Sequence, residues 1–511
     1  MVSIFDQGTP PPCPSPFNMA RHVLAAGART PGKPALVIAG PDGARRCYGH
    51  GDLERMVRGI ASGLLRQGLA PGDRVLMRLG NSLEFPLTFL AAIAAGLVPV
   101  PTSAMLTAPE CSRIAAEIRP ALIVADAGVA LPDAPGVPVV AAGELAQWRD
   151  LPPADYVMGD PERLGYIIYT SGTSGQPRAV CHAHRAIWAR RMMWDGWYGL
   201  TSEDVLLHAG AFNWTYTLGT GLMDPWSRGA TAVIPEAGTR SADLPALLAR
   251  EDVTIFAAAP GVYRQILKHG NRFHLPRLRH GLSAGEKLPD PVRAAWNAAT
   301  GTAIYEAYGM SECSTFVSGA PGHPAPAGAS GYPQPGRRVA VLGEDGQPVP
   351  HGTPGILGVS NRDPGLMLGY WDAEGETRAR FAGEWFLTGD TVSMDADGAI
   401  HYLGRSDDMM NAGGFRVSPL EVERVLNAHP DVLECAAAEV MVKADTTVIA
   451  AFYVSEAEIP EAALSAFAES RLARYKSPRL YRRVPALPKG ANNKILRRKL
   501  REDFEATHGK A

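Results

Sequence analysis

Patterns typical of helices and of buried strands alternate along the first part of the chain, and this alternation limits the fold more than any other feature. From Gly51 to Gly68 apolar residues recur at helical spacing, whereas Arg74–Met77 and Ala121–Ala125 are short apolar runs. Strands that alternate with helices usually run parallel in one sheet, because each helix carries the chain back to the same end. The pattern continues through Ile255–Ala258 to about residue 320. We therefore predict a large α/β body with helices flanking a largely parallel sheet.

The pattern changes between Gly328 and His401, where prolines and glycines are dense and turn pairs such as Asp345-Gly346 and Asp397-Gly398 recur. Such pairs close β-hairpins, so this part of the chain is predicted to form a β-rich lobe. After Gly404 the sequence indicates a small α+β domain of about a hundred residues, near the commonest domain size. Its expected helices and strands are Pro419–Ala428 and Glu461–Leu472, and Leu433–Val440 and Thr447–Val454.

Composition excludes some functions. The 511 residues are 46% hydrophobic and 20% charged, with a formal net charge of -2 and no block of like charges, so binding to nucleic acid is not expected. The six cysteines are far apart and form no Cys-x-x-Cys pair. This spacing predicts free thiols in a reducing, cytoplasmic environment, with neither disulfides nor structural zinc.

The chain shows no membrane or export signal. Its first residues are rich in proline and lack the basic start and apolar core of a secretory signal, so we interpret them as a flexible lead-in. The most apolar stretch, Phe85–Pro101, contains Gly96 and Pro99 and is shorter than the roughly 20 residues that span a bilayer. A buried helix leading into a core strand is expected there, and no integral membrane segment.

A buried-strand pattern at Tyr166–Tyr169 leads directly into Thr170–Arg178, where hydroxyl residues and glycines alternate. Glycines let backbone N–H groups approach an anion closely, hydroxyls add donors, and Arg178 adds positive charge. The segment suits a triphosphate but lacks the G-x-x-x-x-G-K-[ST] spacing of the common P-loop, so kinase or GTPase chemistry is not predicted. Taken alone, it is also compatible with a flexible Ser/Gly surface loop.

Further segments accompany this loop and together resemble one family. Thr170–Val180, Tyr305–Glu312, Glu384–Asp390, Gly404–Asp408 and Pro488–Lys494 resemble, in order, the phosphate, adenine, ribose, hinge and lysine motifs of the adenylate-forming superfamily. That superfamily includes acyl-CoA synthetases, stand-alone adenylation domains and firefly-type luciferases. The resemblance is greatest to benzoate and medium-chain acyl-CoA synthetases. It implies an enzyme that activates a carboxylic acid with ATP as its acyl-adenylate.

The resemblance also implies roles for single residues. Glu312, with Thr170, would bind Mg²⁺, which prefers oxygen ligands, and Ser311 would act near the α-phosphate. Tyr308 would stack on adenine and Asp390 would bind the ribose hydroxyls. Taken singly, these residues have other interpretations: a solvated glutamate for Glu312, a core residue for Tyr308 and a common turn at Asp390. The implied nucleotide and cofactor contacts are Thr170, Ser171, Gly172, Thr173, Ser174, Gly175, Arg178, Glu306, Ala307, Tyr308, Asp390, Arg405, Asp407, Gly413 and Gly414.

Lys494 lies in a basic stretch that is also compatible with an ordinary C-terminal helix. By resemblance it is the catalytic lysine, which orients the carboxylate and offsets charge at the α-phosphate. The same resemblance implies an adenylation domain over 1–404, a hinge over 405–410 and a mobile C-terminal domain over 411–511. Rotation about Asp407 would bring Gly413 and Gly414 to the site for the thiol step, where glycines leave room for a pantetheine arm.

The segments Phe212–Tyr216 and Ser283–Glu286 resemble the acyl-pocket wall of benzoate and medium-chain acyl-CoA synthetases. The pocket residues so implied are Phe212, Asn213, Trp214, Ser283, Ala284 and Gly285. Their large rings predict a short, closed pocket for an aromatic or short-to-medium acid, although an aromatic core cluster is the alternative. Asn213 stands where amino-acid-activating relatives tend to have aspartate, and an amide suits a neutral acid.

The chain departs from the family pattern at several positions. Arg178-Ala179 replaces the usual Lys-Gly, which keeps the charge but changes its shape to a planar fork. Ser311 replaces threonine, and Asn493 stands where glycine precedes the lysine. The cluster Cys181-His-Ala-His184 has metal-binding residue types but no partner cluster, so a zinc site is not expected.

The predicted function is therefore a carboxylate–CoA ligase that uses ATP, Mg²⁺ and coenzyme A. Its partners are small molecules, and a homodimer is the assembly hypothesis. Delivery of the acyl group to a carrier protein, nucleotide binding without catalysis, and an ADP-forming reaction through an acyl-phosphate are the alternatives.

Overall fold

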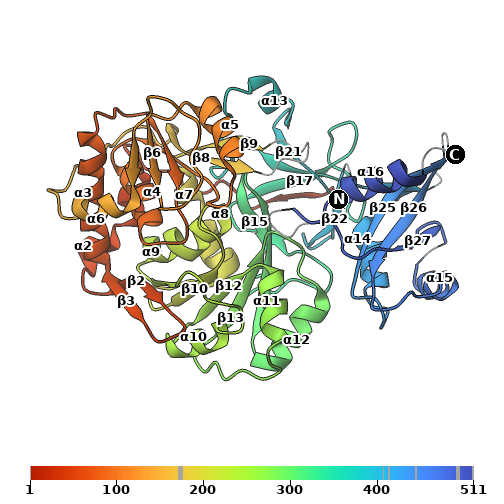
Figure 1. Ribbon diagram of the computed structural model, residues 1–511. Helices are drawn as coiled ribbons and strands as arrows, with labels where there is room; N and C mark the ends of the chain where they lie inside the picture. Colours follow the sequence, from red (N-terminus) through yellow and green to blue (C-terminus); the bar gives the residue numbers. More distant parts are fainter. Residues whose placement is uncertain are drawn as a thin grey trace. The chain divides into compact units, whose positions relative to one another are not determined.

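The computed structural model describes residues 2–170, 177–406, 408–412, 415–443, 446–472, 474–490 and 495–508. The chain divides into two compact units (Figure 1). The large unit comprises Phe5–Arg338 and Ser360–Phe386. The small unit comprises Met1–Ile4, Val339–Val359 and Leu387–Ala511.

A nine-stranded sheet forms the centre of the large unit, in the order β16-β15-β14-β13-β12-β10-β11-β2-β3. The strands from β14 to β2 run parallel, and the strands at both ends are antiparallel to their neighbours. The bounds are β2 (Pro34–Ala39), β3 (Arg45–Gly49), β10 (Val205–Ala209), β11 (Thr231–Pro235), β12 (Ile255–Ala258), β13 (His280–Ala284), β14 (Ala303–Met310), β15 (Ser314–Ser318) and β16 (Tyr332–Pro333).

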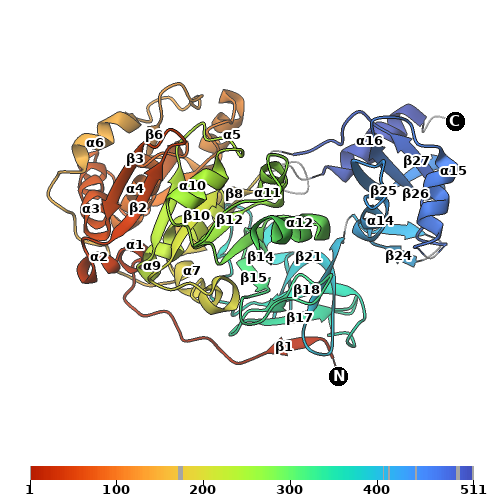
Figure 2. The same cartoon turned by 90° about the horizontal axis from the view of Figure 1, so that it is seen from below.

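Alternate side chains of these strands enter two different cores, as a period of two requires. Phe256 packs with the helices α10 (Leu244–Arg250), α11 (Pro260–Leu267) and α12 (Asp290–Thr300) (Figure 2). Its neighbour Ile255 belongs to a second cluster that contains Trp197, Tyr216 and Leu282. Both faces of the sheet are therefore covered, which explains why central strands such as β11 and β12 are mostly apolar and buried.

A second, four-stranded parallel sheet has the order β5-β4-β6-β7. Its strands are β4 (Arg74–Arg78), β5 (Val98–Pro101), β6 (Leu122–Ala125) and β7 (Val139–Ala141). The helix α3 (His50–Arg66) begins where the Asp52 carboxylate accepts a hydrogen bond from the backbone N–H of Gly49 at 3.2 Å. The helix α4 (Glu84–Ala94) is buried along nearly its whole length, as expected for the apolar stretch that begins at Phe85. Among the described residues, no helix is both long and apolar enough to cross a membrane.

Three antiparallel strands, β8 (Leu164–Thr170), β9 (Arg178–Ala183) and β19 (Gly369–Tyr370), form a third sheet in the order β19-β9-β8. Ile167, Ala179 and Cys181 bury their side chains against residues of the four-stranded sheet, such as Leu76 and Val100. This packing holds the ends of β8 and β9 at a fixed place in the large unit.

The other helical segments of the large unit are short. They are α1 (Met19–Val23), α2 (Ala26–Arg29), α5 (Ala108–Ile118), α6 (Leu145–Trp148), α7 (Ala186–Ala189), α8 (Thr215–Leu218), α9 (Asp224–Arg228), α13 (Glu374–Arg378), a 3₁₀ turn (Ala142–Glu144) and two π-helical turns (Trp194–Tyr198 and Gly219–Met223).

The small unit contains strands of three systems. The first is a sheet of β1 (Ile4–Asp6), β17 (Arg338–Leu342), β18 (Gly355–Ser360), β20 (Phe381–Ala382), β21 (Trp385–Met394) and β22 (Ile400–Arg405), of which β20 belongs to the large unit by its residue range. The hairpin pairs β17–β18 and β21–β22 are antiparallel, which confirms the turns predicted at Gly346 and Gly398. A short hairpin follows, made of β23 (Met410–Ala412) and β24 (Phe415–Val417).

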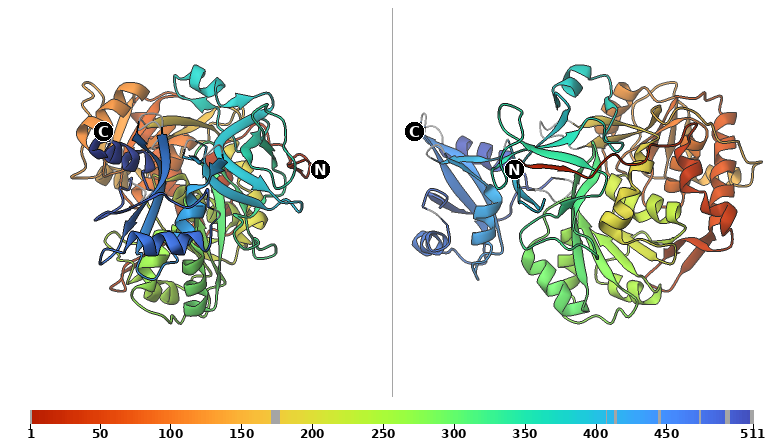
Figure 3. Two further views of the ribbon diagram at one scale, coloured as in Figure 1. Left: turned by 90° about the vertical axis from the view of Figure 1, so that its right-hand side faces the viewer. Right: turned by 180° about the vertical axis from the view of Figure 1, so that it is seen from behind.

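The last part of the small unit is a three-stranded sheet of β25 (Glu434–Lys443), β26 (Thr446–Val454) and β27 (Leu480–Arg483) with helices on its two faces (Figure 3). Cys435 and Ala437 pack with residues of α14 (Pro419–Leu426) and α15 (Glu461–Glu469). Ala436 and Ala438 pack with residues of α16 (Arg497–His508) on the other face. The mixed α/β class and the small α+β part are as predicted from sequence.

Candidate active site

The strands β8 and β9 bring the two ends of the phosphate-binding segment together. Thr170 and Arg178 are directly paired across this antiparallel hairpin. The residues between them that were assigned to the phosphate contact, Ser171, Gly172, Thr173, Ser174 and Gly175, lie outside the described residues. Arg178 is the first residue of β9 and Ala179 is buried, so the last residues of the Thr170–Val180 motif lie in a strand.

The Arg178 guanidinium has two partners. It forms an ion pair with Glu376 of α13 at 2.9 Å, and its Cζ lies 5.2 Å from the centroid of the Tyr370 ring. Its side chain is about one third exposed (32%). A planar guanidinium can stack on a ring and still present N–H groups at its edge, which an ammonium group cannot do in the same way. Arg178 therefore has one contact with a carboxylate and one with an aromatic ring.

The adenine motif occupies the end of β14 and the turn into β15. Tyr308 is half-buried, and its ring contacts Phe316 edge-on at 5.3 Å between centroids. A Cβ at Gly309 would lie 2.2 Å from the carbonyl oxygen of Ser314, so the close approach of the two strands requires glycine there. Ser314 has φ +63°, a conformation that costs free energy in any residue other than glycine. The turn that carries Ser311 and Glu312 is therefore tightly constrained.

Several contacts from other elements hold this turn. The Glu312 carboxylate accepts a hydrogen bond from the Tyr370 hydroxyl at 2.7 Å, and the Glu312 carbonyl accepts one from the backbone N–H of Met367 at 2.7 Å. The Ser311 carbonyl is 2.7 Å from Nε2 of His182. Because a carbonyl can only accept, Nε2 must carry the proton, and this fixes the tautomer of the His182 ring.

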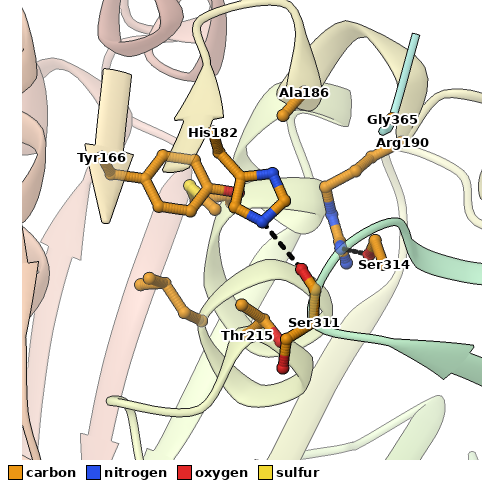
Figure 4. A pocket seen from close by; sticks show the side chains of 10 residues that line it. Tyr166, His182, Ala186, Arg190, Thr215, Ser311, Ser314 and Gly365 are labelled. Carbon is orange, nitrogen blue, oxygen red and sulfur yellow. Dashed lines mark hydrogen bonds between the residues drawn. The ribbon is translucent and has the colours of Figure 1, made fainter. Parts of the chain in front are cut away.

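The His182 ring lies on the wall of a small cavity beneath the Ser311 turn (Figure 4). It stacks on Tyr166 with ring centroids 4.9 Å apart. Burial lowers the pKa of His182 to about 4, so the ring is neutral near pH 7. The cavity has a volume of about 20 Å³, enough for a water molecule but not for an acid substrate. Its lining residues are Tyr166, His182, Ala186, Arg190, Thr215, Leu218, Met223, Ser311, Ser314 and Gly365.

A buried ion pair supports the far side of the cavity. Arg190 binds both oxygens of Asp224 through Nε, at 2.9 and 3.0 Å, and binds one of them again through Nη2 at 2.6 Å. Arg190 also donates to the Ser314 hydroxyl, while the Tyr198 hydroxyl donates to Asp224 at 2.7 Å. The bond from Arg190 reaches Ser314, the residue with positive φ, and so helps to maintain the conformation of the turn. No sequence signal pointed to this pair, because Arg190 belongs to none of the motifs.

The carboxylate of Glu306, assigned above to the nucleotide, is engaged within the large unit. It contacts Lys287 at 3.2 Å and Arg293 at 3.0 Å, and accepts from the backbone N–H of Leu288 at 3.2 Å. Burial raises the pKa of Glu306, against the effect of the two cations. Ala307 is buried beside it. A nucleotide contact at Glu306 and Ala307 would therefore use the backbone.

The residues assigned to the acid pocket divide into two groups. Phe212 is buried and packs on Phe85, with ring centroids 5.6 Å apart, in the core of the large unit. Asn213 and Trp214 are only half-buried. The Trp214 ring lies against the end of β13, where a Cβ on Gly285 would be 2.6 Å from its Cζ2. Gly285 has φ +96°, so both its backbone and this ring require glycine.

Ser283 and Ala284 are buried directly before Gly285. The Ser283 hydroxyl has no hydrogen-bond partner within the part of the chain that the structure describes. A buried donor of this kind can serve a polar group of a bound molecule.

The small unit brings together the two residues assigned to the ribose contact. Asp390 on β21 and Arg405 on β22 are register partners, and Arg405 Nη1 lies 3.2 Å from an Asp390 carboxylate oxygen. Asp407, Gly413, Gly414 and Lys494 lie outside the described residues. Sequence reasoning missed one contact of the described residues in the small unit. Arg497, at the start of α16, binds both oxygens of Glu423 at 2.9 and 2.8 Å and approaches Asp408 at 3.5 Å.

Comparison with known proteins identifies the family. The model of the AMP-binding enzyme family matches residues 23–371, and that of the AMP-binding enzyme C-terminal domain matches residues 421–494. The chain belongs to the AMP-binding enzyme family. It is 32% identical over 477 residues to benzoate–CoA ligase of Thauera aromatica, covering 85% of this chain and 86% of that protein. It is 30% identical over 488 residues to 4-hydroxybenzoate–CoA/benzoate–CoA ligase of Rhodopseudomonas palustris, covering 90% and 89%.

A solved structure agrees with these relatives. The anthranilate CoA ligase AuaEII in complex with anthranoyl-AMP superposes with a TM-score of 0.88 at 28% identity, covering 97% of this chain and 99% of that one. The AMP-binding enzyme described here is thus an adenylate-forming enzyme and an AMP-forming acid–thiol ligase, as the motifs predicted.

The histidine cluster of this AMP-binding enzyme has ordinary structural partners. His182 bonds the Ser311 carbonyl, and His184 accepts through Nδ1 from the backbone N–H of Met19 at 3.1 Å. Across the described ranges, no group of three or more potential metal-ligating side chains gathers at one point.

Proposed function

We propose that this enzyme joins an aromatic or short-to-medium-chain carboxylic acid to coenzyme A. The observation that carries the proposal is the Trp214 ring, which lies against Gly285 at the end of β13. If these residues line the acid pocket, a ring at this place shortens it. The rings of Trp214 and Tyr216 meet edge-on with centroids 5.5 Å apart, so the Trp214 ring is held by packing against a neighbouring ring. The benzoate-type relatives support the same class of acid.

The proposed reaction has two steps. A carboxylate oxygen attacks the α-phosphorus of MgATP, the bond to pyrophosphate breaks, and acyl-AMP forms. The thiolate of coenzyme A then attacks the acyl carbon, the bond to AMP breaks, and the thioester is released with AMP; the thiol proton passes to water. The catalytic roles proposed for Ser311 and Lys494 belong to the first step, in which charge develops around the α-phosphate.

The nucleotide roles rest on local geometry in each unit. Glu312 offers a carboxylate, the ligand type that Mg²⁺ prefers, and one of its oxygens is already oriented by Tyr370. Arg178 suits the departing pyrophosphate. The Asp390–Arg405 pair suits two ribose hydroxyls and a phosphate. The domain division at 404, the hinge over 405–410 and the C-terminal domain over 411–511 remain part of the proposal.

A panel of acids tests the proposal. Benzoate, 3-hydroxybenzoate, 2-aminobenzoate, hexanoate and palmitate would be incubated with MgATP and coenzyme A, with pyrophosphate, nucleotide and thioester measured by chromatography. We expect AMP and a thioester with at least one of the first four acids, at a kcat/KM about a hundredfold above that for palmitate, because a misfitting chain forfeits about 3 kcal/mol of binding. Equal turnover of palmitate would contradict the closed pocket, and ADP as product would contradict the reaction.

The same assay separates the alternatives. An enzyme that loads a carrier protein would release pyrophosphate without forming a CoA thioester. A nucleotide-binding protein without catalysis would release neither pyrophosphate nor AMP with any acid.

A further inference from the structure

A short segment of the large unit contacts two motifs that are far apart in sequence. The backbone N–H of Leu368 donates to the Cys181 carbonyl at 2.8 Å, and that of Trp371 donates to the Ala179 carbonyl at 2.9 Å, so the segment is held along β9. The N–H of Met367 donates to the Glu312 carbonyl at 2.7 Å. Residues 367–371 therefore fix the separation between β9, which begins with Arg178, and the turn that carries Glu312.

Tyr370 is the side chain of this segment that reaches both motifs. Its hydroxyl donates to Oε1 of Glu312 at 2.7 Å, while its ring lies under the Arg178 guanidinium at 5.2 Å. Tyr370 is itself buried, with 6% of its surface exposed. Burial, together with the adjacent Glu312 charge, raises the pKa of Tyr370 to about 12. Because a carboxylate can only accept, the hydroxyl donates to Glu312, and its oxygen also accepts from Arg178.

The geometry suits the orientation of a metal ligand. The hydrogen bond from Tyr370 is made to Oε1 of Glu312, so it does not use the second carboxylate oxygen, Oε2. Residues that bond a ligating carboxylate in this way commonly set its orientation and affect metal affinity by about tenfold to a hundredfold. The ring, in turn, lies under the guanidinium, whose ion-pair partner, Glu376, is more than half exposed at 55% and holds it only weakly.

We propose that Tyr370 is a positioning residue that sets the Glu312 carboxylate for the magnesium ion of MgATP and the Arg178 guanidinium for the triphosphate. The inference rests on the proposed function only in taking Glu312 as the metal-binding carboxylate and Arg178 as a phosphate contact. The hydroxyl serves Glu312, whereas Arg178 contacts both the ring and the hydroxyl of Tyr370.

The test is the affinity for ATP measured by titration calorimetry, once with Mg²⁺ and once with EDTA, so that no acid substrate is needed. Y370F keeps the ring and removes the hydroxyl. We expect Y370F to reduce the Mg²⁺-dependent gain in ATP affinity by about tenfold, while ATP affinity in EDTA stays within about twofold. Y370L removes the ring as well, and we expect it also to weaken ATP binding in EDTA by about threefold or more.

Tyr156 provides a matched control, because its hydroxyl donates to a glutamate, Glu54, at 3.1 Å, on a helix that carries none of the motifs. Y156F should leave both affinities unchanged. Thermal midpoints of all variants would show that each is folded. An unchanged Mg²⁺-dependent gain in Y370F, or an equal loss with Mg²⁺ and with EDTA, would overturn the proposal.

Failure of the proposed function would look different. In that case the parent protein would still bind ATP more tightly with Mg²⁺, and Y370F would still reduce this gain, but no acid of the panel would yield acyl-AMP. A parent protein whose ATP affinity does not respond to Mg²⁺ would overturn the positioning role directly.

Discussion

Replacing His182 by phenylalanine should change the pH dependence of stability in a way that can be worked out from the structure. Burial holds the pKa of His182 at about 4, below its ordinary value of 6.5. The folded ring therefore binds fewer protons than the unfolded ring between these values, and its contribution to stability falls as the pH drops from 6.5 towards 4. The pKa difference contributes about 3 kcal/mol in full to the free energy of unfolding, and about 2 kcal/mol of this contribution is lost between pH 7.5 and pH 5.

The substitution H182F removes this titration but also removes the hydrogen bond to the Ser311 carbonyl. Leaving a carbonyl without its donor costs about 1 kcal/mol, net of the gain from removing a buried polar ring. At pH 7.5 the variant should thus be about 1 kcal/mol less stable than the parent. At pH 5 it should be about 1 kcal/mol more stable, because it no longer loses the 2 kcal/mol that the parent loses.

Tryptophan fluorescence during urea unfolding provides the assay. The sequence contains nine tryptophans, and all of them fall within the large unit, so the signal reports the unit that contains His182. H280F is the matched control, since His280 also bonds a carbonyl, that of Tyr198 at 2.9 Å, and also has its pKa lowered by burial to about 4. H280F should show the same crossover, whereas only H182F should lower the rate of acyl-AMP formation.

Two results would refute this reasoning. If H182F and the parent lose stability in parallel from pH 7.5 to pH 5, the folded His182 ring is able to take up a proton and is not held neutral. If H280F lowers acyl-AMP formation as much as H182F does, the bond to Ser311 has no special effect on the turn.

Three further outcomes are expected. G285A should lower kcat/KM for the acid by about tenfold in steady-state kinetics, because the new Cβ displaces the Trp214 ring, while the KM for ATP stays unchanged. An equal rise in the KM for ATP would contradict this role. R190M should lower the free energy of unfolding of the large unit by about 3–5 kcal/mol, since Asp224 would keep a buried charge, and R190M/D224L should recover most of this loss; if the double variant is no more stable than R190M, the buried charge is not the cause. K494A should abolish acyl-AMP formation but spare thioester formation from supplied acyl-AMP, and equal loss of both half-reactions would exclude separate roles for the C-terminal domain.

Much of the fold could be predicted because the relevant signals are local. Apolar residues at helical spacing indicated α3, and short apolar runs indicated β4 and β6, since burial of one helix face or of a whole strand leaves its period in the sequence. The two strands and two helices of the C-terminal part were found for the same reason. Their ends were less well placed: α15 ends at Glu469, three residues before the predicted end.

The sequence led to predictions about the chemistry of the site wherever the assigned residues are contiguous. Glycines, hydroxyls and a cation in one run indicated phosphate binding, and the order of the motifs indicated the family. Arg178 is an example of a residue whose contacts the sequence did not show. Its charge was evident from the sequence, but only the pairing of β9 with β19 shows that it lies over the Tyr370 ring and pairs with Glu376.

The sequence by itself thus determined the class of fold, the family and the residue types of the nucleotide site. Only the tertiary structure decided which side chains hold those residues in place: Tyr370 on Glu312, His182 on Ser311, and Arg190 beside Ser314. The physical reason is that periodicity records whether a residue is buried, whereas its partner depends on the order in which strands pair and on the packing of the segments between them. Contacts between residues 58, 129 and 124 positions apart leave no period in the sequence.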